Sequence, residues 1–302
     1  MAEPPSSKAE KLAQYFIEKR PEGSTKSSPS LLAQIEHRIK LVSFWAIAPG
    51  SRVLEIGCGQ GDCTVALADA VGEHGHVDAV DPGAPDYGAP FTLSQAQSHI
   101  TNSALGPRIA FHCTTPTSYI ESYTGAPYDY IVLSHSIYYF SNPSILPDLL
   151  SSLSSLPAYN THLCIAEWSL HSRSQSSSPH VLTALLCSLL ESKQTVESSG
   201  NIRTVLSPEQ ISRAAQKSGW GMERESVVET GEGMQDAYWE VRDLIRKRHG
   251  EGGLLAGLDG LGDAERTVIE AMGDAVVGAV GGVDGGLSGM RCMDVWIGRF
   301  VR

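Results

Sequence analysis

Long hydrophobic runs are absent from this sequence. No apolar stretch approaches the about 20 residues that a helix needs to cross a bilayer. The opening residues, MAEPPSS, also lack the charged start and apolar centre of a secretory signal. We therefore expect a soluble, cytoplasmic protein without a membrane partner.

Basic residues are scarce. The chain has 23 Lys and Arg against 34 Asp and Glu, a formal net charge of −11, and no basic run exceeds Arg246-Lys247-Arg248. Such a chain is a poor partner for the phosphates of nucleic acids and for anionic membrane surfaces. We expect neither a nucleic-acid nor a membrane partner.

Several reactive motifs are also missing. The six cysteines form no C-x-x-C pair and the ten histidines form no H-x-x-x-H pair, so we expect reduced thiols and no metal site. There is no G-x-S-x-G nucleophile elbow, no phosphate-loop lysine and no N-P-P-Y motif. The sequence therefore lacks the common signatures of serine hydrolases, of nucleoside triphosphatases and of the methyltransferases that act on nucleic-acid amino groups and protein amides.

A glycine-rich turn is the most informative feature that is present. The apolar strand Val53–Ile56 leads into Gly57, Gly59 and Gly61, and residues 62–71 then place apolar side chains at helical spacing. Glycine allows positive φ and lets a ligand lie against the backbone. The free N–H groups of the helix start face this turn, which favours a polar, partly anionic ligand.

The next acidic residue narrows the class of ligand. Asp81 ends the expected strand 76–80, twenty residues after Gly61, where a carboxylate can accept both hydroxyls of a ribose. Dinucleotide enzymes share this layout, but their fingerprint is G-x-G-x-x-G. Here the spacing is G-x-G-x-G, and Glu55 two residues before it would repel a pyrophosphate.

The pattern E-x-G-x-G-x-G, followed by the acid after the second strand, resembles the first motifs of class I S-adenosylmethionine-dependent methyltransferases. The resemblance covers about residues 30–168, more loosely 200–229, and the last strand. It implies that the glycine loop lies against the methionine part of S-adenosylmethionine and that Asp81 holds the ribose. Thr114 and Thr115 fall where family members hold the adenine. The implied cofactor residues are Glu55, Gly57, Cys58, Gly59, Gly61, Asp81, Pro82, Thr114, Thr115, Ser134 and His135.

Two residues are candidates for catalysis. His135 follows the fourth expected strand, with a pKa range that suits a general base, and Glu167 ends the fifth, where a carboxylate can orient an acceptor. The alternatives are that His135 only packs or hydrogen-bonds near the adenine and that Glu167 caps local backbone. Tyr138, Tyr139 and Trp168 are candidates for an aromatic acceptor pocket.

The resemblance implies an α/β fold: a doubly wound, seven-stranded, mostly parallel sheet with helical lid insertions. We expect N-terminal helices over 1–50 covering the cofactor cleft, a cofactor-binding core over 51–168 and a lid helix insertion over 169–206. The C-terminal part, 207–302, completes the core and contains a helical, glycine-rich insertion at about 234–289. One helix is predicted from about Lys8 to Arg20. Another is predicted with Asn142 as its N-cap and Pro143 at its first position.

The implied function is transfer of a methyl group from S-adenosylmethionine to an oxygen or nitrogen of a small, hydrophobic or aromatic molecule. Lidded enzymes of this kind are associated with secondary metabolism. Two alternatives remain: a protein methyltransferase that docks its substrate on the glycine-rich segments, and a cofactor-binding protein with a non-methylating role. The sequence does not predict the acceptor or the oligomeric state.

Overall fold

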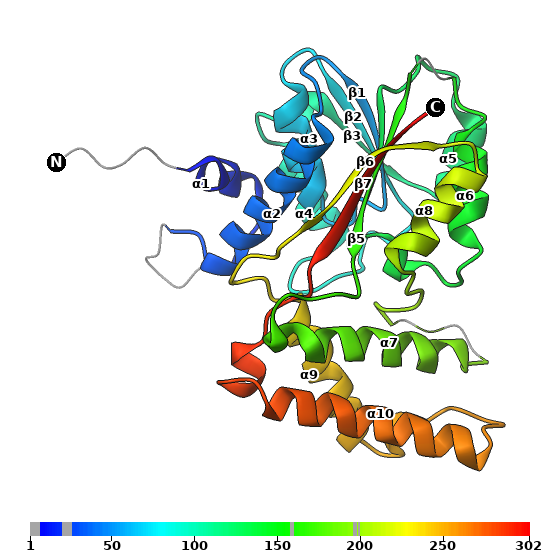
Figure 1. Ribbon diagram of the computed structural model, residues 1–302. Coiled ribbons are helices and arrows are strands. Elements are labelled where there is room, and N and C mark those ends of the chain that lie inside the picture. The colour runs from blue at the N-terminus through cyan, green and yellow to red at the C-terminus, as the bar shows by residue number, and fades with distance from the viewer. Residues whose placement is uncertain (1–6, 20–25, 158–159, 196–197, 199) are drawn as a thin grey trace.

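The computed structural model describes residues 7–19, 26–157, 160–195, 198 and 200–302. Its centre is a seven-stranded sheet in the order β3-β2-β1-β4-β5-β7-β6 (Figure 1). The strands are β1 Arg52–Ile56, β2 His76–Asp81, β3 Ile109–Cys113, β4 Tyr130–Ser134, β5 His162–Trp168, β6 Gly221–Val228 and β7 Val295–Val301. Strands β1 to β5 are parallel, and β7 runs antiparallel to both β5 and β6. The predicted fold class is confirmed.

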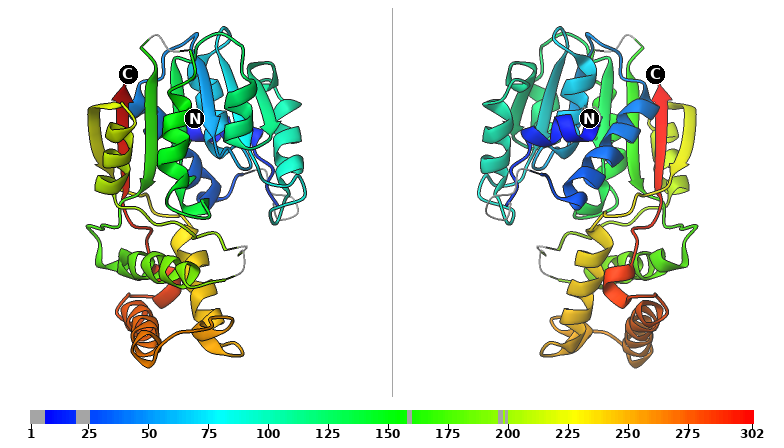
Figure 2. Two further views of the ribbon diagram at one scale, coloured as in Figure 1. Left: turned by 90° about the vertical axis from the view of Figure 1, so that its right-hand side faces the viewer. Right: turned by 90° about the vertical axis from the view of Figure 1, so that its left-hand side faces the viewer.

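Helices cover both faces of this sheet (Figure 2). One face carries α2 Pro29–Trp45, α3 Asp62–Val71 and α4 Leu93–Thr101, and the other carries α5 Pro116–Ser122, α6 Ile145–Leu153 and α8 Pro208–Lys217. Each face has its own apolar core, because the strands are buried on both sides. The first core centres on Leu41, Trp45 and Val65, and the second on Leu149, Leu150 and Trp220. The short helix α1 Lys8–Leu12 packs against α2.

Helix starts follow the capping signals in the sequence. Ser28 accepts a hydrogen bond from the amide of Leu31 and precedes Pro29 at the first position of α2. Thr92 and Ser207 form capping boxes at α4 and α8, as their spacing predicts.

Three local expectations need correction. Helix α1 ends at Leu12 and continues only as a 3₁₀ turn to Tyr15, because Phe16 is extended; Arg20, the predicted end, lies outside the described residues. Helix α6 begins at Ile145, because the side chain of Asn142 accepts hydrogen bonds from Ser144 and forms a turn of its own. Helix α5 was not predicted; Thr115 caps it by accepting a hydrogen bond from the amide of Ser118.

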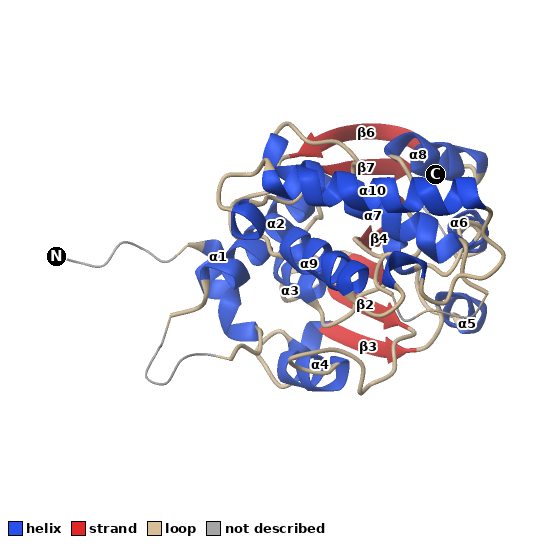
Figure 3. Ribbon diagram, turned by 90° about the horizontal axis from the view of Figure 1, so that it is seen from below, coloured by secondary structure: helices blue, strands red, loops and turns tan. Residues whose placement is uncertain are grey.

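Three further helices form a separate layer, here called the helical unit. They are α7 Ser178–Ser192, α9 Asp236–His249 and α10 Asp263–Gly281. They share a core that includes Leu186, Leu190, Val241, Leu244, Ile269 and Val276. The helical unit lies across the end of the sheet where the parallel strands finish (Figures 1 and 3). None of the described helices combines the length and the apolar character that a membrane span requires.

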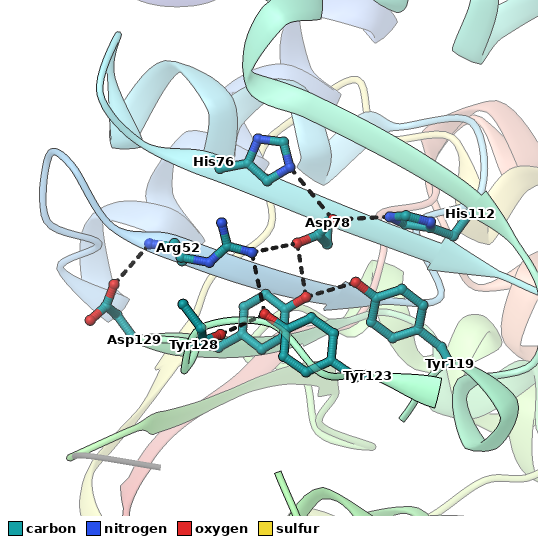
Figure 4. A network of polar contacts seen from close by, with 9 residues as sticks. Arg52, His76, Asp78, His112, Tyr119, Tyr123, Tyr128 and Asp129 are labelled. Atoms are coloured by element: carbon teal, nitrogen blue, oxygen red, sulfur yellow. Dashed lines mark hydrogen bonds and ion pairs between the residues drawn. The ribbon is translucent and has the colours of Figure 1, made fainter. Parts of the chain in front are cut away.

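A buried carboxylate ties together the three strands at the β3 side of the sheet (Figure 4). Asp78 of β2 is 7% exposed. It accepts a hydrogen bond from the hydroxyl of Tyr128 at 2.8 Å, contacts Nε2 of His112 in β3 at 3.0 Å and pairs with Nη2 of Arg52 in β1 at 3.2 Å. Burial alone would raise the pKa of Asp78, but the hydrogen bonds from His112 and Tyr128 and the charges of His76 and His112 outweigh burial and lower it.

Asp78→Asn is expected to lower the free energy of unfolding by about 1–3 kcal/mol, because the buried side chain no longer forms the ion pairs of the carboxylate. The folded pKa lies below that of the unfolded chain, about 3.9, so the ionised carboxylate stabilises the fold above about pH 4. That contribution is lost as pH falls through the folded pKa. Urea unfolding of both proteins across pH measures the difference.

The matched control is Asp259→Asn, which removes an exposed carboxylate and is expected to change the free energy of unfolding by less than about 0.5 kcal/mol. A difference between wild type and Asp78→Asn that stays constant from neutral pH to about pH 2 would contradict the role given to the charge of Asp78.

Candidate active site

The glycine turn joins β1 to α3 at the carboxyl edge, the edge of the sheet where the parallel strands end. Gly57, Gly59 and Gly61 have φ of +77°, +52° and +96°, values that side chains with a Cβ rarely adopt. The amide of Gly57 donates to the carbonyl of Val80 in β2 at 2.8 Å. The turn is thereby held against the neighbouring strand.

Two of these glycines differ in their surroundings. A Cβ built on Gly57 would lie 2.4 Å from Cβ of Ser136, which follows β4. A Cβ on Gly59 would meet no heavy atom within 4 Å. Gly57 therefore permits close approach of two loops, whereas Gly59 borders open space beside the backbone.

Asp81 organises the neighbouring loop. Its two carboxylate oxygens accept hydrogen bonds from the amides of Gly59 and Gly83, each at 2.8 Å, and its own carbonyl accepts from the amide of Thr114 at 3.1 Å. A carboxylate has about four acceptor positions, so it retains capacity for donors from a ligand. A pocket of about 410 Å³ adjoins it, lined in part by Leu93, Phe111 and Cys113. Pro82 is exposed beside it.

Glu55 lies beneath the glycine turn rather than on its surface. It is 1% exposed, and its Oε2 accepts a hydrogen bond from the hydroxyl of Thr64 in α3 at 2.5 Å. Burial raises its pKa to about 7, although the hydrogen bond from Thr64 and the charge of Arg38 oppose the shift. Cys58 is also buried, and burial raises the pKa of its thiol.

His135 directly follows β4 in a left-handed conformation, with φ of +54°, and its amide donates to the carbonyl of Ala166 at 2.8 Å. Its Nε2 lies 3.0 Å from Nε2 of His37 in α2, so one ring donates and the other accepts. Its Nδ1 lies 3.7 Å from Oε1 of Glu167. Burial, together with the charge of Arg38, lowers the pKa of His135 well below its usual value. The imidazole is therefore neutral at neutral pH.

Glu167, predicted as the last residue of the fifth strand, is the penultimate residue of β5 and is completely buried. Its carboxylate accepts hydrogen bonds from the amides of Ile137 and Trp168, each at 3.0 Å, and thereby fixes the 3₁₀ turn Ile137–Tyr139 after β4. Burial raises its pKa to about 7, opposed by these backbone hydrogen bonds. Glu167 therefore holds the backbone after β4 and also lies next to His135.

The helical unit contributes side chains to the same edge. His180 of α7 contacts Oε2 of Glu240 in α9 at 2.8 Å, and Trp168 lies between the rings of His180 and His135, with centroids 4.9 and 4.6 Å away. Tyr139 is 53% exposed, and burial followed by the charge of Glu240 in α9 raises its pKa. A pocket of about 370 Å³ opens between α7 and α9, with apolar lining from Leu190, Ile202, Trp239 and Leu244.

Six buried polar atoms at this edge have no hydrogen-bond partner among the described residues. They are Nδ1 of His37, Nη1 of Arg38, Oγ of Ser134, Nδ1 of His135, Oγ of Ser136 and the hydroxyl of Tyr138. Buried polar groups are normally paired, so such a concentration marks a place where a ligand completes the network.

Most, but not all, of the residues predicted from the sequence lie together in the structure. Glu55, the three glycines, Asp81, Ser134, His135 and Glu167 converge on the carboxyl edge. Thr114 joins them through Asp81, whereas the hydroxyl of Thr115 is used to cap α5. The residues that were not predicted are His37, Arg38, His180, Asp236 and Glu240. Arg38 lies on the same helical stripe as Ile35, Val42 and Trp45, where a charged residue is itself a signal.

Gly57→Ala and Gly59→Ala test the two roles in the turn. Gly59→Ala is expected to cost about 1–2 kcal/mol of unfolding free energy from backbone strain alone. Gly57→Ala also overpacks the side chain of Ser136. It is expected to lower the free energy of unfolding by about a further 1–3 kcal/mol. Urea unfolding at neutral pH compares them. Equal losses for the two variants would mean that the loop carrying Ser136 moves aside freely.

Comparison with known proteins agrees with this geometry. The sequence matches the methyltransferase domain family over residues 29–225. It is 26% identical over 288 residues to methyltransferase phomM of Diaporthe leptostromiformis, which covers 81% of this chain and 71% of that protein. The crystal structure of a cyclopropane-fatty-acyl-phospholipid synthase-like protein from Lactobacillus casei has a TM-score of 0.80 at 27% identity, over 97% of this chain and 98% of that one.

A more distant structure shares the fold. Mycolic acid cyclopropane synthase CmaA1, solved with S-adenosylhomocysteine (SAH) and CTAB, has a TM-score of 0.51 at 13% identity, over 97% of this chain and 94% of that one. The family match covers most of the cofactor-binding core, including the glycine turn, Asp81 and the end of β4. This chain belongs to the methyltransferase domain family and is an S-adenosylmethionine-dependent methyltransferase with the class I fold.

Proposed function

We propose that this enzyme transfers the methyl group to an oxygen or nitrogen of a small, hydrophobic or aromatic molecule that binds between the sheet and the helical unit. The observation that carries the proposal is the juxtaposition of a neutral, buried His135 with aromatic and apolar side chains at the carboxyl edge. The similarity to methyltransferase phomM supports the methyl transfer. The role in secondary metabolism is part of the proposal.

The residues at the carboxyl edge fit the cofactor. Asp81 has acceptor capacity for the ribose hydroxyls, and the open space at Gly59 lets a ligand approach the backbone. The pocket beside Asp81 and the end of β3 is of a size that suits an adenosine. We assign Glu55, Cys58, Pro82, Thr115 and Ser134 to the surroundings of this site, with Glu55 acting through its charge.

S-adenosylmethionine, when bound, supplies an electrophilic methyl group on a sulfonium. The protein's tasks are to align the acceptor with that methyl and to exclude water. The acceptor atom would take up the methyl group that the cofactor supplies, and His135 would hold the proton that the acceptor loses. Its neutral imidazole is in the form that accepts a proton.

Glu167 and His37 position this base. His37 contacts Nε2 of His135 at 3.0 Å, and Glu167 faces Nδ1 at 3.7 Å while its backbone hydrogen bonds hold the turn that follows. With a pKa of about 7, Glu167 exchanges a proton readily at neutral pH. A proton received by His135 therefore has an adjacent carboxylate that stabilises it.

The pocket between α7 and α9 is the proposed entry for the acceptor. Its wall combines Leu190, Ile202 and Leu244 with the half-exposed ring of Trp239. Glu240 at this pocket contacts His180, which packs on Trp168 beside His135. An apolar or aromatic molecule suits this lining better than a highly charged one.

The activity is tested with purified protein, cofactor carrying a labelled methyl group, and a panel of hydroxylated and aminated aromatic molecules. The expected result is transfer of label to a small acceptor, identified by mass spectrometry. Label that enters only proteins of a cell extract would contradict the proposal and favour a protein methyltransferase.

His135→Gln is expected to lower kcat by about 10²- to 10⁴-fold, the usual contribution of a general base, while leaving the affinity for SAH unchanged. The control His74→Gln alters an exposed histidine at the opposite end of the strands and is expected to leave both quantities unchanged. An unchanged kcat in His135→Gln would mean that the acceptor arrives deprotonated.

Asp81→Asn is expected to weaken SAH binding by about 10- to 100-fold, because a charge-assisted hydrogen bond contributes about 1.5–3 kcal/mol. Calorimetric titration measures the affinity, and Asp259→Asn serves as the matched control. Equal affinities in Asp81→Asn and wild type would remove Asp81 from the proposed site.

A further inference from the structure

A carboxylate without a cationic partner lines the pocket of about 370 Å³ between α7 and α9. It belongs to Glu240 of α9, whose side chain is 18% exposed. Its Oε2 accepts a hydrogen bond from Nε2 of His180 at 2.8 Å. No described residue donates a hydrogen bond to its Oε1, and no described Lys or Arg forms an ion pair with it. One oxygen of a mostly buried carboxylate is therefore left for a ligand.

The hydrogen bonds of His180 fix its neutral tautomer. Its Nδ1 accepts a hydrogen bond from the backbone amide of Met293 at 3.0 Å, so this nitrogen carries no proton. The proton of the ring is on Nε2, which donates to Glu240, and the side chain of His180 is fully buried. The contact holds the carboxylate in place but supplies no counter-charge. Burial accordingly raises the pKa of Glu240, although His180 opposes the shift.

Two further carboxylates line the same pocket, and each has an arginine partner. Glu191 of α7 pairs with Nε of Arg203 at 3.2 Å. Asp243 of α9 pairs with Nη2 of Arg242 at 3.1 Å. Glu240 differs from both, because its only partner among the described residues is a neutral ring. The charge that the pocket leaves to a ligand is therefore that of Glu240.

Aromatic and apolar side chains share the pocket with this carboxylate. Trp239, the preceding residue of α9, lines the pocket with a side chain that is 48% exposed. The face of an indole ring attracts cations. Leu190 and Leu244 add apolar surface. A ligand that satisfies this lining has an apolar body and one positively charged end.

We propose that the acceptor carries a protonated amine, distinct from the atom that receives the methyl group, and that Glu240 binds this ammonium. A carboxylate and an ammonium form a charge-assisted hydrogen bond. Trp168 lies between the rings of His180 and His135, with centroids 4.9 and 4.6 Å away. The ammonium and the methylated atom are thus separated by the width of this ring. The inference rests on the acceptor pocket and the base of the proposed function.

Three phenols that differ only in one end group test this contact. Tyramine ends in an ammonium, 4-propylphenol in a methyl group and 3-(4-hydroxyphenyl)propionate in a carboxylate. Calorimetric titration into protein saturated with SAH measures their affinities, and transfer of a labelled methyl group measures their KM. Wild type is expected to bind tyramine most tightly. Glu240→Gln is expected to weaken tyramine by about 10- to 100-fold, the range of a charge-assisted hydrogen bond, and to leave 4-propylphenol unchanged.

The variants are chosen to separate recognition from folding. Glu240→Gln keeps an oxygen that accepts from His180, so its affinity for SAH is expected to equal that of wild type. Glu270→Gln removes an exposed carboxylate of α10 in the same helical unit and is expected to change none of the affinities. Trp239→Leu keeps apolar surface but lacks the aromatic face, so it is expected to weaken tyramine more than 4-propylphenol.

The outcomes are separable. Equal weakening of tyramine and 4-propylphenol in Glu240→Gln would give Glu240 a structural role and overturn the inference. Tightest binding of the propionate by wild type would assign charge recognition to Lys247, an exposed residue of the same pocket, and also overturn it. Methyl transfer to small acceptors without a preference for an ammonium would refute this inference alone. Absence of both binding and transfer for every small acceptor would refute the proposed function itself.

Discussion

The close approach of the loops after β1 and β4 is the constraint on which the site depends. Gly57 lies against Ser136 where a Cβ would come within 2.4 Å, so the two loops meet only because this residue has no side chain. The approach holds His135 in its left-handed conformation, and Glu167 fixes the turn that follows by accepting the amide of Ile137. Asp81 fixes the glycine turn from its other side through the amide of Gly59. Adjacent strand ends thus position both the proposed cofactor contacts and the proposed base.

The helical unit is built from two insertions that lie apart in the sequence. Helix α7 follows β5, whereas α9 and α10 lie between β6 and β7, and the three helices share an apolar core. Ala184 of α7 and Ala237 of α9 pack instead in the core on the α2 and α3 face of the sheet. Its links to the rest of the protein include polar contacts such as Gln34 with Asp236 at 3.3 Å and the amide of Met293 with Nδ1 of His180 at 3.0 Å. The helical unit is therefore joined to the sheet by both polar contacts and a small shared apolar contact, and it contributes side chains to the site from this position.

The sheet and the glycine turn were predictable because their signals are local. Apolar runs that end in glycine or aspartate predict buried parallel strands. The starts of three helices are predicted by their N-caps, which are Ser28, Thr92 and Ser207. The partners of His135 were not predictable, because His37 lies 98 residues away and neither histidine stands in a motif. The same holds for Arg38: only the tertiary structure reveals that a residue on an otherwise ordinary amphipathic helix is enclosed and unpaired. Asn142 shows the converse, since its side chain forms a local turn in place of the predicted cap.

The charges at the carboxyl edge also explain which nucleoside ligand the site favours. Glu55 and Glu167 are buried, with pKa values raised to about 7, and the charge of the buried Arg38 opposes both shifts. Interactions between charges are stronger in such an enclosed setting than in water. A positively charged ligand is favoured beside these carboxylates. The two phosphates of a dinucleotide would instead lie over Glu55 at the glycine turn, where their charge is opposed rather than balanced. The electrostatics therefore select the same cofactor as the spacing of Gly57, Gly59 and Gly61, through a different physical cause.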